Sequence, residues 1–541
     1  MRKRLLLAFS LANLCLYGAW REVLSPEASS HFYYWKHYPG YVALAALAGN
    51  VALLTALFLL CFYLTRRFGG RHASQLARAG FVLVFLLALN SAYVQLNSLT
   101  GHWLRAHLGR AGLVIIIGLL LAALGGALVR YGLQKFARVV AIILLIMSPF
   151  GVLGFLQATW QAVKYDRLVE HEQTNAPLSA TSAQTQRRVV WLIFDELDER
   201  VAFAARPPGV SLPEFDRLQQ ESFTATNAFP PGSHTMQSLP ALLTGQLVAA
   251  VKPVGPDELL LTIAPQQTTV RWSTQADIFN AARAAGLNTA VVGWYHPYCR
   301  IIGARLNACY AEPASQLIDF TRFSFADNLR RQARSLLYLL PFAKAPRPPT
   351  RQLNADALRS DHLNDYRALV AHADALTTDQ RFGLVFVHLP VPHPPNIYDR
   401  ATGAFTTTGA STYLDNLALA DRTFGELRRA MERAGTWEQT TVLVSSDHWW
   451  RADFWRGHPF WTAEDEALSA GRVDHRVPFL VKLAGQHTAR TYQPAFNTVL
   501  THDLILTILN GQISDAAQLA AWLDAHRTIG ESPYESYDDT E

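Results

Sequence analysis

Long apolar stretches dominate the first 160 residues of this 541-residue chain, and they restrict its fold more than any other feature. Five of them approach the length that crosses a bilayer, about 20 residues. They cover residues 5–24, 40–64, 80–98, 112–131 and 138–159. Buried helices of soluble proteins rarely reach this length with so few charges. The pattern therefore predicts an α-helical membrane domain of five spans over residues 1–160.

The basic residues around these stretches predict an orientation. Ten lie before the first stretch, after the second, or between the fourth and fifth: Arg2, Lys3, Arg4, Arg66, Arg67, Arg71, Arg78, Arg130, Lys135 and Arg138. Four lie on the other side: Arg21, Lys36, Arg105 and Arg110. The positive-inside rule then puts the N-terminus in the cytoplasm and everything after residue 160 outside. We expect a multi-pass protein of the inner (cytoplasmic) membrane with a periplasmic or extracellular domain. A cleaved signal peptide at the first stretch would leave the later topology unchanged.

The rest of the chain divides by composition. Residues 161–188 end in a Thr-, Ser- and Gln-rich run and are predicted to be a linker. Residues 189–527 form the outside domain, and the acidic residues 528–541 are predicted to be a disordered tail. The formal net charge of +5 comes from basic residues that are scattered or flank apolar runs, which argues against a nucleic-acid partner. Cys299 and Cys309 are spaced for a disulfide, although two buried free thiols fit the spacing as well.

Short apolar runs alternate with helical patterns from residue 189 onward. The runs are "VVWLIF", "TAVVGWY", "FGLVFVHL", "TTVLVSS" and "VPFLVKL". Runs of β-branched and aromatic residues suit buried strands, and strand–helix alternation implies a mostly parallel sheet flanked by helices. In such α/β sheets, functional groups collect beyond the carboxyl ends of the strands.

Acids and histidines follow several of these predicted strands. They are Asp195 and Glu196, His388 and His393, Asp447 and His448, and, near the last strand, His458 and His475. Carboxylates and imidazoles suit a divalent metal: zinc or manganese, with magnesium possible if oxygen ligands dominate. Each residue also has a plainer interpretation, since an aspartate after a strand is commonly a helix cap and a lone histidine commonly lies in a loop. Their recurrence at several strand ends favours the metal site.

A hydroxyl-rich stretch, "PPGSHTMQSLPALLTG" at residues 231–246, leads into a predicted helix. Thr235 at the start of this helix is a candidate nucleophile, because metal coordination activates a hydroxyl and a helix N-terminus favours an anionic phosphate. Ser238, one turn along, and the neighbouring His234 are candidates to touch the substrate. The alternative is that Ser233 or Thr235 only caps the helix.

With these motifs the chain resembles the sulfatase-like branch of the alkaline phosphatase superfamily, and most closely its membrane-anchored phosphoethanolamine transferases and lipoteichoic acid synthases. Those enzymes have five spans and an outward-facing α/β catalytic domain. Their "G-x-x-T-x-x-S-h-P" stretch, with h apolar, matches "GSHTMQSLP", so the resemblance makes Thr235 the nucleophile. Their metal-binding acid after the first strand matches Asp195, with Glu196 beside it.

Further motifs extend the resemblance. The "DH" pair of the family matches Asp447 and His448, and its "H-x-P" histidine matches His393. A later histidine matches His458, with His475 as its competitor. Two departures matter. The cysteines that flank the nucleophile in many phosphoethanolamine transferases are absent, and the Pro and Arg of the sulfatase signature are replaced by Gln237 and Leu239. A threonine also cannot mature to formylglycine.

The resemblance implies a two-step transfer through a covalent threonine intermediate. A membrane phospholipid, such as phosphatidylethanolamine or phosphatidylglycerol, would donate its phospho-head group to Thr235, and an envelope glycan or lipid would accept it. The expected metal-binding residues are Asp195, Glu196, Thr235, Asp447 and His448. His393 and His458 would bind phosphate or move protons, and Ser238, His475 and His234 would contact the substrate. Two alternatives are a membrane-anchored phosphodiesterase or sulfatase-like hydrolase and a catalytically inactive lipid-binding regulator.

Overall fold

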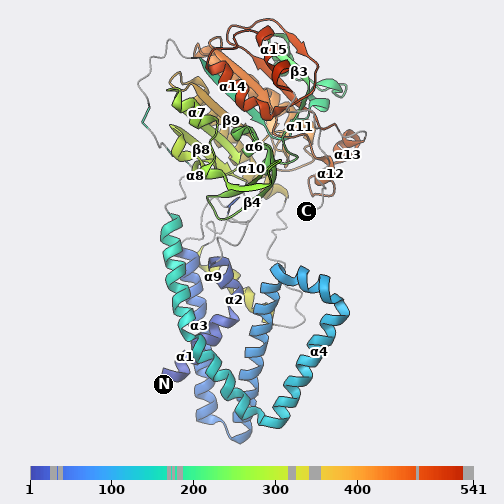
Figure 1. The fold of residues 1–541 in the computed structure, drawn as a ribbon. Coiled ribbons are helices and arrows are strands. Elements are labelled where there is room, and N and C mark those ends of the chain that lie inside the picture. The colour runs from blue at the N-terminus through green and yellow to red at the C-terminus, as the bar shows by residue number, and fades with distance from the viewer. Residues whose placement is uncertain are drawn as a thin grey trace. The chain divides into compact units, whose positions relative to one another are not determined.

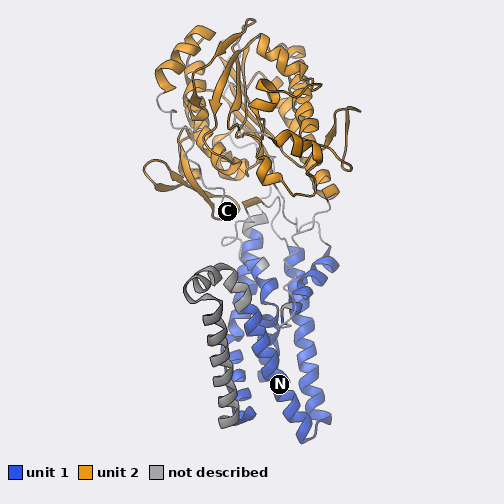
Figure 2. Ribbon diagram, turned by 90° about the vertical axis from the view of Figure 1, so that its right-hand side faces the viewer, with its two compact units in different colours: residues 1–26, 37–169, 318–350 blue, residues 27–36, 170–317, 351–541 orange. Residues whose placement is uncertain are grey.

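The protein forms two compact units in a computed structural model. The structure describes residues 2–24, 33–34, 41–166, 172–173, 177–178, 187–314, 324–339, 355–470 and 474–527, with no side chains over 93–131. The helical unit takes residues 1–26, 37–169 and 318–350, and the α/β unit takes residues 27–36, 170–317 and 351–541 (Figure 2). Two short pieces of sequence are thus exchanged: residues 27–36 belong to the α/β unit, and residues 318–350 belong to the helical unit.

The helical unit is built from long apolar helices (Figure 1). Its helices are α1 (Arg2–Cys15), α2 (Tyr17–Leu24), α3 (Tyr41–Phe68), α4 (Arg71–Asp166) and α9 (Phe325–Ala333), followed by the 3-10 helix η6 (Arg334–Leu339). Among the described residues, three segments are long and apolar enough to cross a membrane: Tyr41–Phe68, Arg71–Ala92 and Gly132–Val163.

The prediction of five spans is therefore corrected to three candidate spans. The first expected span, 5–24, falls on α1 with 14 residues and α2 with 8 residues, which meet at Leu16, and neither helix is a candidate span. The fourth, 112–131, lies outside the residues whose side chains are described. The second, third and fifth expected spans overlap the three candidates.

Helix α9 packs on α3 through polar groups. Asn50 on α3 donates to the carbonyl oxygen of Leu329 at 3.0 Å and to Gln332 at 3.2 Å, and Gln332 donates to the carbonyl oxygen of Ala43 at 2.8 Å. The sequence "NLRRQARSLLYLLPF" at residues 328–342 is basic in its first part and apolar in its second. The structure assigns its described part, residues 328–339, to the helical unit.

The α/β unit contains one large sheet with the strand order β1-β8-β7-β9-β2-β12-β13-β3-β14, with β15 also pairing β3 (Figure 1). Its strands are β1 (Glu172–Gln173), β2 (Arg188–Phe194), β3 (Phe223–Phe229), β7 (Thr289–Tyr295), β8 (Ala308–Pro313), β9 (Leu384–Leu389), β12 (Thr440–Ser445), β13 (Val477–Lys482), β14 (Arg490–Tyr492) and β15 (Phe496–Asn497). The central strands β8, β7, β9, β2 and β12 are mutually parallel, whereas β13 runs antiparallel to both of its neighbours. The five predicted strands and the mostly parallel sheet are confirmed.

Helices cover both faces of this sheet. The helices of the α/β unit are α5 (Pro213–Gln220), α6 (Thr235–Thr244), α7 (Ile278–Ala284), α8 (Tyr298–Ile301), α10 (Ala355–Thr378), α11 (Tyr413–Arg433), α12 (Ala452–Trp455), α13 (Ala463–Ser469), α14 (Thr501–Leu509) and α15 (Ala516–His526). Every residue of β2 is buried, and its side chains alternate between two cores. Trp191 and Ile193 pack with α6, α7, α14 and α15, and Leu192 and Phe194 pack with α5, α10 and α11. A strand that is covered on both faces is largely apolar, as residues 189–194 are.

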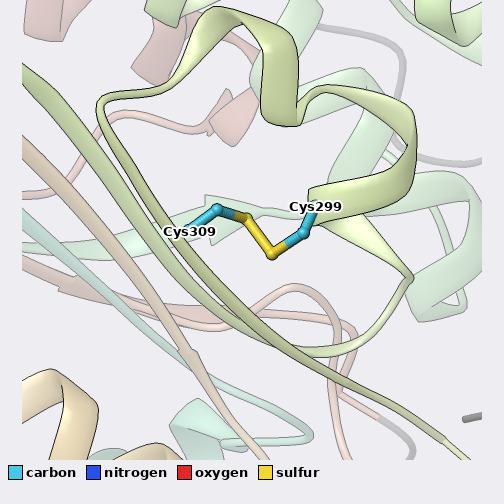
Figure 3. The surroundings of a disulfide bond; sticks show 2 residues. All are labelled: Cys299 and Cys309. Carbon is cyan, nitrogen blue, oxygen red and sulfur yellow. A yellow bond between two sulfur atoms is a disulfide. The ribbon is translucent and has the colours of Figure 1, made fainter. Parts of the chain in front are cut away.

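Smaller elements complete the α/β unit. Strands β4 (Val248–Pro253), β5 (Leu259–Ile263) and β6 (Thr268–Arg271) form an antiparallel sheet, and β10 (Tyr398–Asp399) pairs with β11 (Ala404–Phe405). A disulfide joins Cys299 on α8 to Cys309 on β8, so the bridge, and not a pair of free thiols, is found (Figure 3).

Candidate active site

The site is assembled where three parallel strands end side by side. In the order β9-β2-β12, Ile193 pairs with His388 on one side and with Ser445 on the other. Asp195 follows β2 directly, and Asp447 and His448 come two and three residues after Ser445. Because the carboxyl ends of parallel strands share one edge of the sheet, these side chains converge.

Thr235 brings a hydroxyl to this edge from the start of α6. Its Oγ1 donates to Oδ2 of Asp195 at 3.2 Å and lies 3.2 Å from Nε2 of His448. The side chain is buried, and the N-cap of α6 is His234, which makes no side-chain capping bond. Thr235 therefore lies against the acid and the histidine and does not cap the helix.

The ligand atoms of a divalent cation site are present beside Thr235. One atom each from Asp195, His388 and Asp447 lies within 4.8 Å of the others, and all three residues are buried. Nε2 of His448 lies 3.4 Å from Oδ2 of Asp447 and 3.7 Å from Oδ1 of Asp195. Oδ1 of Asp195, Oδ2 of Asp447 and Nε2 of His388 have no hydrogen-bond partner among the described residues. Buried polar atoms rarely stay unsatisfied, and oxygen and nitrogen ligands in this arrangement fit a metal ion.

The electrostatics of the group also fit a cation. Burial raises the pKa of Asp195 and of Asp447 to about 7, and burial lowers the pKa of His388 to about 4. Two carboxylates placed together away from water are costly unless a positive charge compensates them. A neutral imidazole with a free nitrogen is also the form of histidine that binds a metal.

His388 was noted in the sequence at a strand end but was not among the expected ligands. It is the fifth residue of the six-residue strand β9, and its Nδ1 donates to the carbonyl oxygen of Trp294 at 2.9 Å. That bond leaves Nε2 to face Oδ2 of Asp195 at 3.3 Å. A polar residue inside a fully buried strand was the available signal, and only the register shows that it reaches Asp195.

Glu196 lies next to Asp195, but its carboxylate takes other partners. Its backbone has a φ of +61°, and its carboxylate accepts bonds from Nε1 of Trp455 at 2.8 Å and Nε of Arg451 at 3.2 Å. Burial raises the pKa of Glu196 to about 8 even with Arg451 beside it. In this structure the expected ligand is therefore paired with Arg451. Arg451 was missed in the sequence, although it follows the "DH" pair by three residues.

His393 lies in the loop that follows β9 and is tied to the site by its backbone, whose N–H donates to the carbonyl oxygen of Asp195 at 3.0 Å. Its ring makes edge contacts with Trp294 and Trp455, with centroids 4.8 and 4.9 Å apart. Burial lowers the pKa of His393 well below its ordinary value, and Nδ1 has no hydrogen-bond partner among the described residues.

The other expected substrate residues are placed differently. Ser238 is buried one turn into α6, close to Gly232, and its hydroxyl has no hydrogen-bond partner among the described residues. His234 is exposed, with its Nδ1 2.6 Å from the hydroxyl of Ser233. His458 is exposed and packs with the rings of Phe454, Trp455 and Phe460, and His475 stacks on Trp449. The buried Asp195, His388 and Asp447 group includes neither His458 nor His475.

Comparison with known proteins agrees with this site. The sulfatase family model matches residues 187–510, which is more than half of the chain. The chain belongs to the sulfatase family. Members of this family are metal-dependent enzymes of the alkaline phosphatase superfamily, and the sulfatase domain here has the buried Asp195, His388 and Asp447 group that fits a metal. No curated protein matches the sequence.

Solved structures similar to this sulfatase domain include hydrolases of several kinds. Phosphonate monoester hydrolase of Agrobacterium radiobacter is 12% identical over 60% of this chain and 74% of its own, with a TM-score of 0.37. PsFucS1 sulfatase from Pseudoalteromonas sp. is 16% identical over 61% and 68%, with a TM-score of 0.39. Murine ectonucleotide pyrophosphatase/phosphodiesterase 5 is 11% identical over 62% and 99%, with a TM-score of 0.35. Identities this low carry no substrate over to this chain.

Proposed function

We propose that this chain is a membrane-anchored phosphotransferase that takes the phospho-head group of a membrane phospholipid onto Thr235 and passes it to an envelope glycan or lipid. The observation that carries the proposal is the buried hydroxyl of Thr235, held 3.2 Å from both Asp195 and His448 at the edge of the candidate metal group. A hydroxyl among metal-ligating side chains is the arrangement of an activated nucleophile.

The residue type argues for phosphorus and against sulfate ester chemistry. A threonine cannot become formylglycine, and Gln237 and Leu239 stand where a sulfatase signature has Pro and Arg. Gln237 instead donates to the carbonyl oxygen of Ala249 at 3.4 Å and also to that of Val248, at the start of β4, so it has a structural partner. The site thus keeps the family's metal chemistry with a different nucleophile.

The transfer takes two balanced steps. In the first, Oγ1 of Thr235 gives its proton to water and bonds to phosphorus, and the bond from phosphorus to the glycerol oxygen breaks. Diacylglycerol leaves after taking up a proton from water, and the buried His393 would bind the phosphoryl oxygens. In the second step, an acceptor hydroxyl bonds to phosphorus and loses its proton, and the bond to Oγ1 of Thr235 breaks as the oxygen regains one. A divalent cation held by Asp195, His388, Asp447 and His448 would stabilise the negative charge of the phosphoryl oxygens.

The apolar helices suit a lipid donor. The candidate spans Tyr41–Phe68 and Gly132–Val163 expose many large apolar side chains, as membrane helices do. Under the proposal the α/β unit lies outside the cytoplasmic membrane, where its disulfide is stable. An enzyme anchored there can draw its donor from the bilayer.

The deciding experiment measures the intact mass of the full chain in phospholipid nanodiscs with zinc or manganese. Wild type should gain the mass of a phosphoethanolamine or phosphoglycerol group, and Thr235→Ala should gain none. Thr244→Ala is the matched control, because Thr244 ends the same helix and bonds only the carbonyl oxygen of Pro240 among the bonds described for its hydroxyl. Phosphodiester cleavage without an adduct would favour a hydrolase. Neither adduct nor cleavage, with no metal bound, would leave a lipid-binding regulator.

A further inference from the structure

A buried histidine connects the nucleophile to a distant part of the chain. Nε2 of His296 lies 3.0 Å from the backbone carbonyl oxygen of Thr235, and Nδ1 of His296 lies 2.6 Å from the hydroxyl of Tyr33. Tyr33 comes from the sequence between α2 and α3, yet it belongs to the α/β unit. Tyr33 and His296 are both fully buried.

The partners of His296 determine which of its nitrogens carries the proton. A carbonyl oxygen can only accept, so Nε2 must be the N–H that donates to Thr235. His296 is fully buried and its hydrogen-bond partners are a carbonyl oxygen and a hydroxyl, which do not compensate a positive charge, so the ring is neutral and Nδ1 carries no proton. Nδ1 is therefore an acceptor, and the hydroxyl of Tyr33 must donate to it. The tyrosine hydroxyl selects the tautomer that holds the nucleophile's peptide group.

Aromatic rings close around His296 and keep it in this orientation. The ring centroids of Trp272, Tyr295 and Tyr298 lie 5.1, 5.3 and 5.5 Å from that of His296. The neighbouring Tyr34 adds a second attachment, since its hydroxyl lies 3.3 Å from that of Tyr295. An imidazole packed on its faces and edges cannot turn freely to exchange its two nitrogens.

The start of α6 needs such an external restraint. Its N-cap residue makes no side-chain capping bond, and Pro240 has no N–H to offer to the carbonyl oxygen of Met236 one turn earlier. Thr235 is the first residue of this turn. The direction of its peptide group sets the direction of its Cα–Cβ bond, and hence where Oγ1 points.

We propose that Tyr33 and His296 are positioning residues for Thr235, with Tyr33 acting through the tautomer of His296. This inference rests on the proposed function only in taking Thr235 as the nucleophile. It adds that part of the catalytic apparatus comes from the segment between the first helices. A chain that starts after the linker would lack Tyr33 and with it the bond to His296.

The test uses the full chain and removes one hydroxyl at a time. Tyr33→Phe keeps the ring and removes the donor to His296. Tyr366→Phe is the matched control, because its buried hydroxyl bonds Thr423 at 2.7 Å in the core beneath α10 and α11. His296→Gln gives a third background, in which an amide N–H can reach the carbonyl oxygen of Thr235 without help from Tyr33.

Turnover of a chromogenic phosphodiester is the first readout. Tyr33→Phe should lower kcat about tenfold with KM within about twofold, since small displacements of a nucleophile are costly. Tyr366→Phe should leave kcat unchanged. In the His296→Gln background, Tyr33→Phe should cause no further loss, because the two residues act in series. Equal losses in both backgrounds would show that the hydroxyl only supports packing and would overturn the proposal.

Hydrogen exchange of the peptide covering residues 231–246 is the second readout and needs no activity. It should be faster in Tyr33→Phe than in wild type, and unchanged in Tyr366→Phe. Unchanged exchange in Tyr33→Phe overturns the positioning role whatever the activity. If wild type forms no adduct and cleaves no phosphodiester, the proposed function is wrong. The hydrogen-exchange comparison still tests the positioning role of Tyr33 in that case.

Discussion

The helical unit and the α/β unit use apolar residues in opposite ways. In the helical unit, Leu53, Ile146 and Phe150 are 62%, 66% and 66% exposed. In the α/β unit, every residue of β2 is buried, and the polar side chains of Asp195 and Asp447 are buried beside them. The helical unit thus exposes large apolar side chains, and the α/β unit buries acidic side chains. This difference is the one expected if, as proposed, lipid surrounds the helical unit and water surrounds the α/β unit.

The largest expected effect removes the acid at the centre of the buried group. Asp195 contacts Thr235, His388 and His448, so Asp195→Asn should lower phosphodiester turnover by about 10³-fold or more, because a metal site and a nucleophile partner are lost together. The measurement is turnover with zinc or manganese, together with the bound metal per chain.

The control for this variant is a second buried acid in the same unit. Asp277 caps α7 and pairs with Arg305 at 2.6 Å, away from the candidate metal group. Asp277→Asn should lower the unfolding temperature and leave kcat close to that of wild type. Similar losses of turnover in both variants would mean that buried acids act here through folding alone.

The candidate site could be predicted from the sequence where an acid or a histidine comes just after a buried strand. Asp195, Asp447 and His448 come just after apolar runs, so the sequence alone predicts that they lie at the same edge of a parallel sheet. Glu196 shows the limit, since a φ of +61° turns its carboxylate to Arg451 and no local pattern reveals this backbone angle. The contact of Tyr33 with His296 could not be predicted from the sequence, because the two residues are 263 positions apart and no sequence pattern connects them.

Part of the fold could likewise be predicted from the sequence, and part could not. Mostly apolar runs predicted strands β2, β7, β9, β12 and β13, because a strand covered on both faces is largely apolar. Apolar length identified the helical unit but overstated its spans. The stretch 5–24 has the composition of a span, yet α1 and α2 are 14 and 8 residues long and neither is a candidate span.

The second prediction compares the surfaces of the two units directly. Ile146 lies near the middle of the candidate span Gly132–Val163, and Ile146→Lys should cost about 3 kcal/mol of stability in a bilayer, because a charge at the centre of a membrane helix is unfavourable. Leu178→Lys, at an exposed position of the α/β unit, should change stability by no more than about 0.5 kcal/mol. Denaturant unfolding in nanodiscs measures both. Equal costs would argue that water, not lipid, surrounds Ile146.

The third prediction tests the cost of burying charge in the metal-free site. The pKa of Asp447 in the folded protein, about 7, lies above its usual 3.8. The stability that its protonated form contributes is therefore fully present below pH 3.8 and is lost as the pH rises through 7. With divalent metal removed by a chelator, the free energy of unfolding of Asp447→Asn relative to wild type should rise by about 1.3 kcal/mol from pH 6 to pH 8. This corresponds to roughly 3 °C in unfolding temperature.

The comparison with the variant is needed because buried histidines titrate with the opposite sign. The pKa of His388, about 4, lies below its usual value, so its contribution rises with pH, and the difference removes the part of it that Asp447 does not influence. Asp374→Asn, at an exposed position on α10, should show no such gain. Zinc should stabilise wild type more at pH 8 than at pH 6, since ligands must lose their protons to bind. A gain that does not change with pH would place the charge of Asp447 in contact with solvent.

The smallest expected effect concerns residues 318–350, which contain α9 and belong to the helical unit although the sequences on both sides of them belong to the α/β unit. Asn50→Ala removes two hydrogen bonds from α3 to α9, and such bonds between membrane helices contribute about 0.6 kcal/mol on average. Hydrogen exchange of residues 324–339 should become about threefold faster, the factor that 0.6 kcal/mol implies. Ser148→Ala is the control, because Ser148 bonds only within α4 among the bonds described for its hydroxyl. If α9 exchanges as in wild type, then its apolar contacts with α3 hold it in place. The hydrogen bonds of Asn50 would then contribute little to the packing of α9 on α3, and the contrast between the units would be sharper than the structure alone suggests.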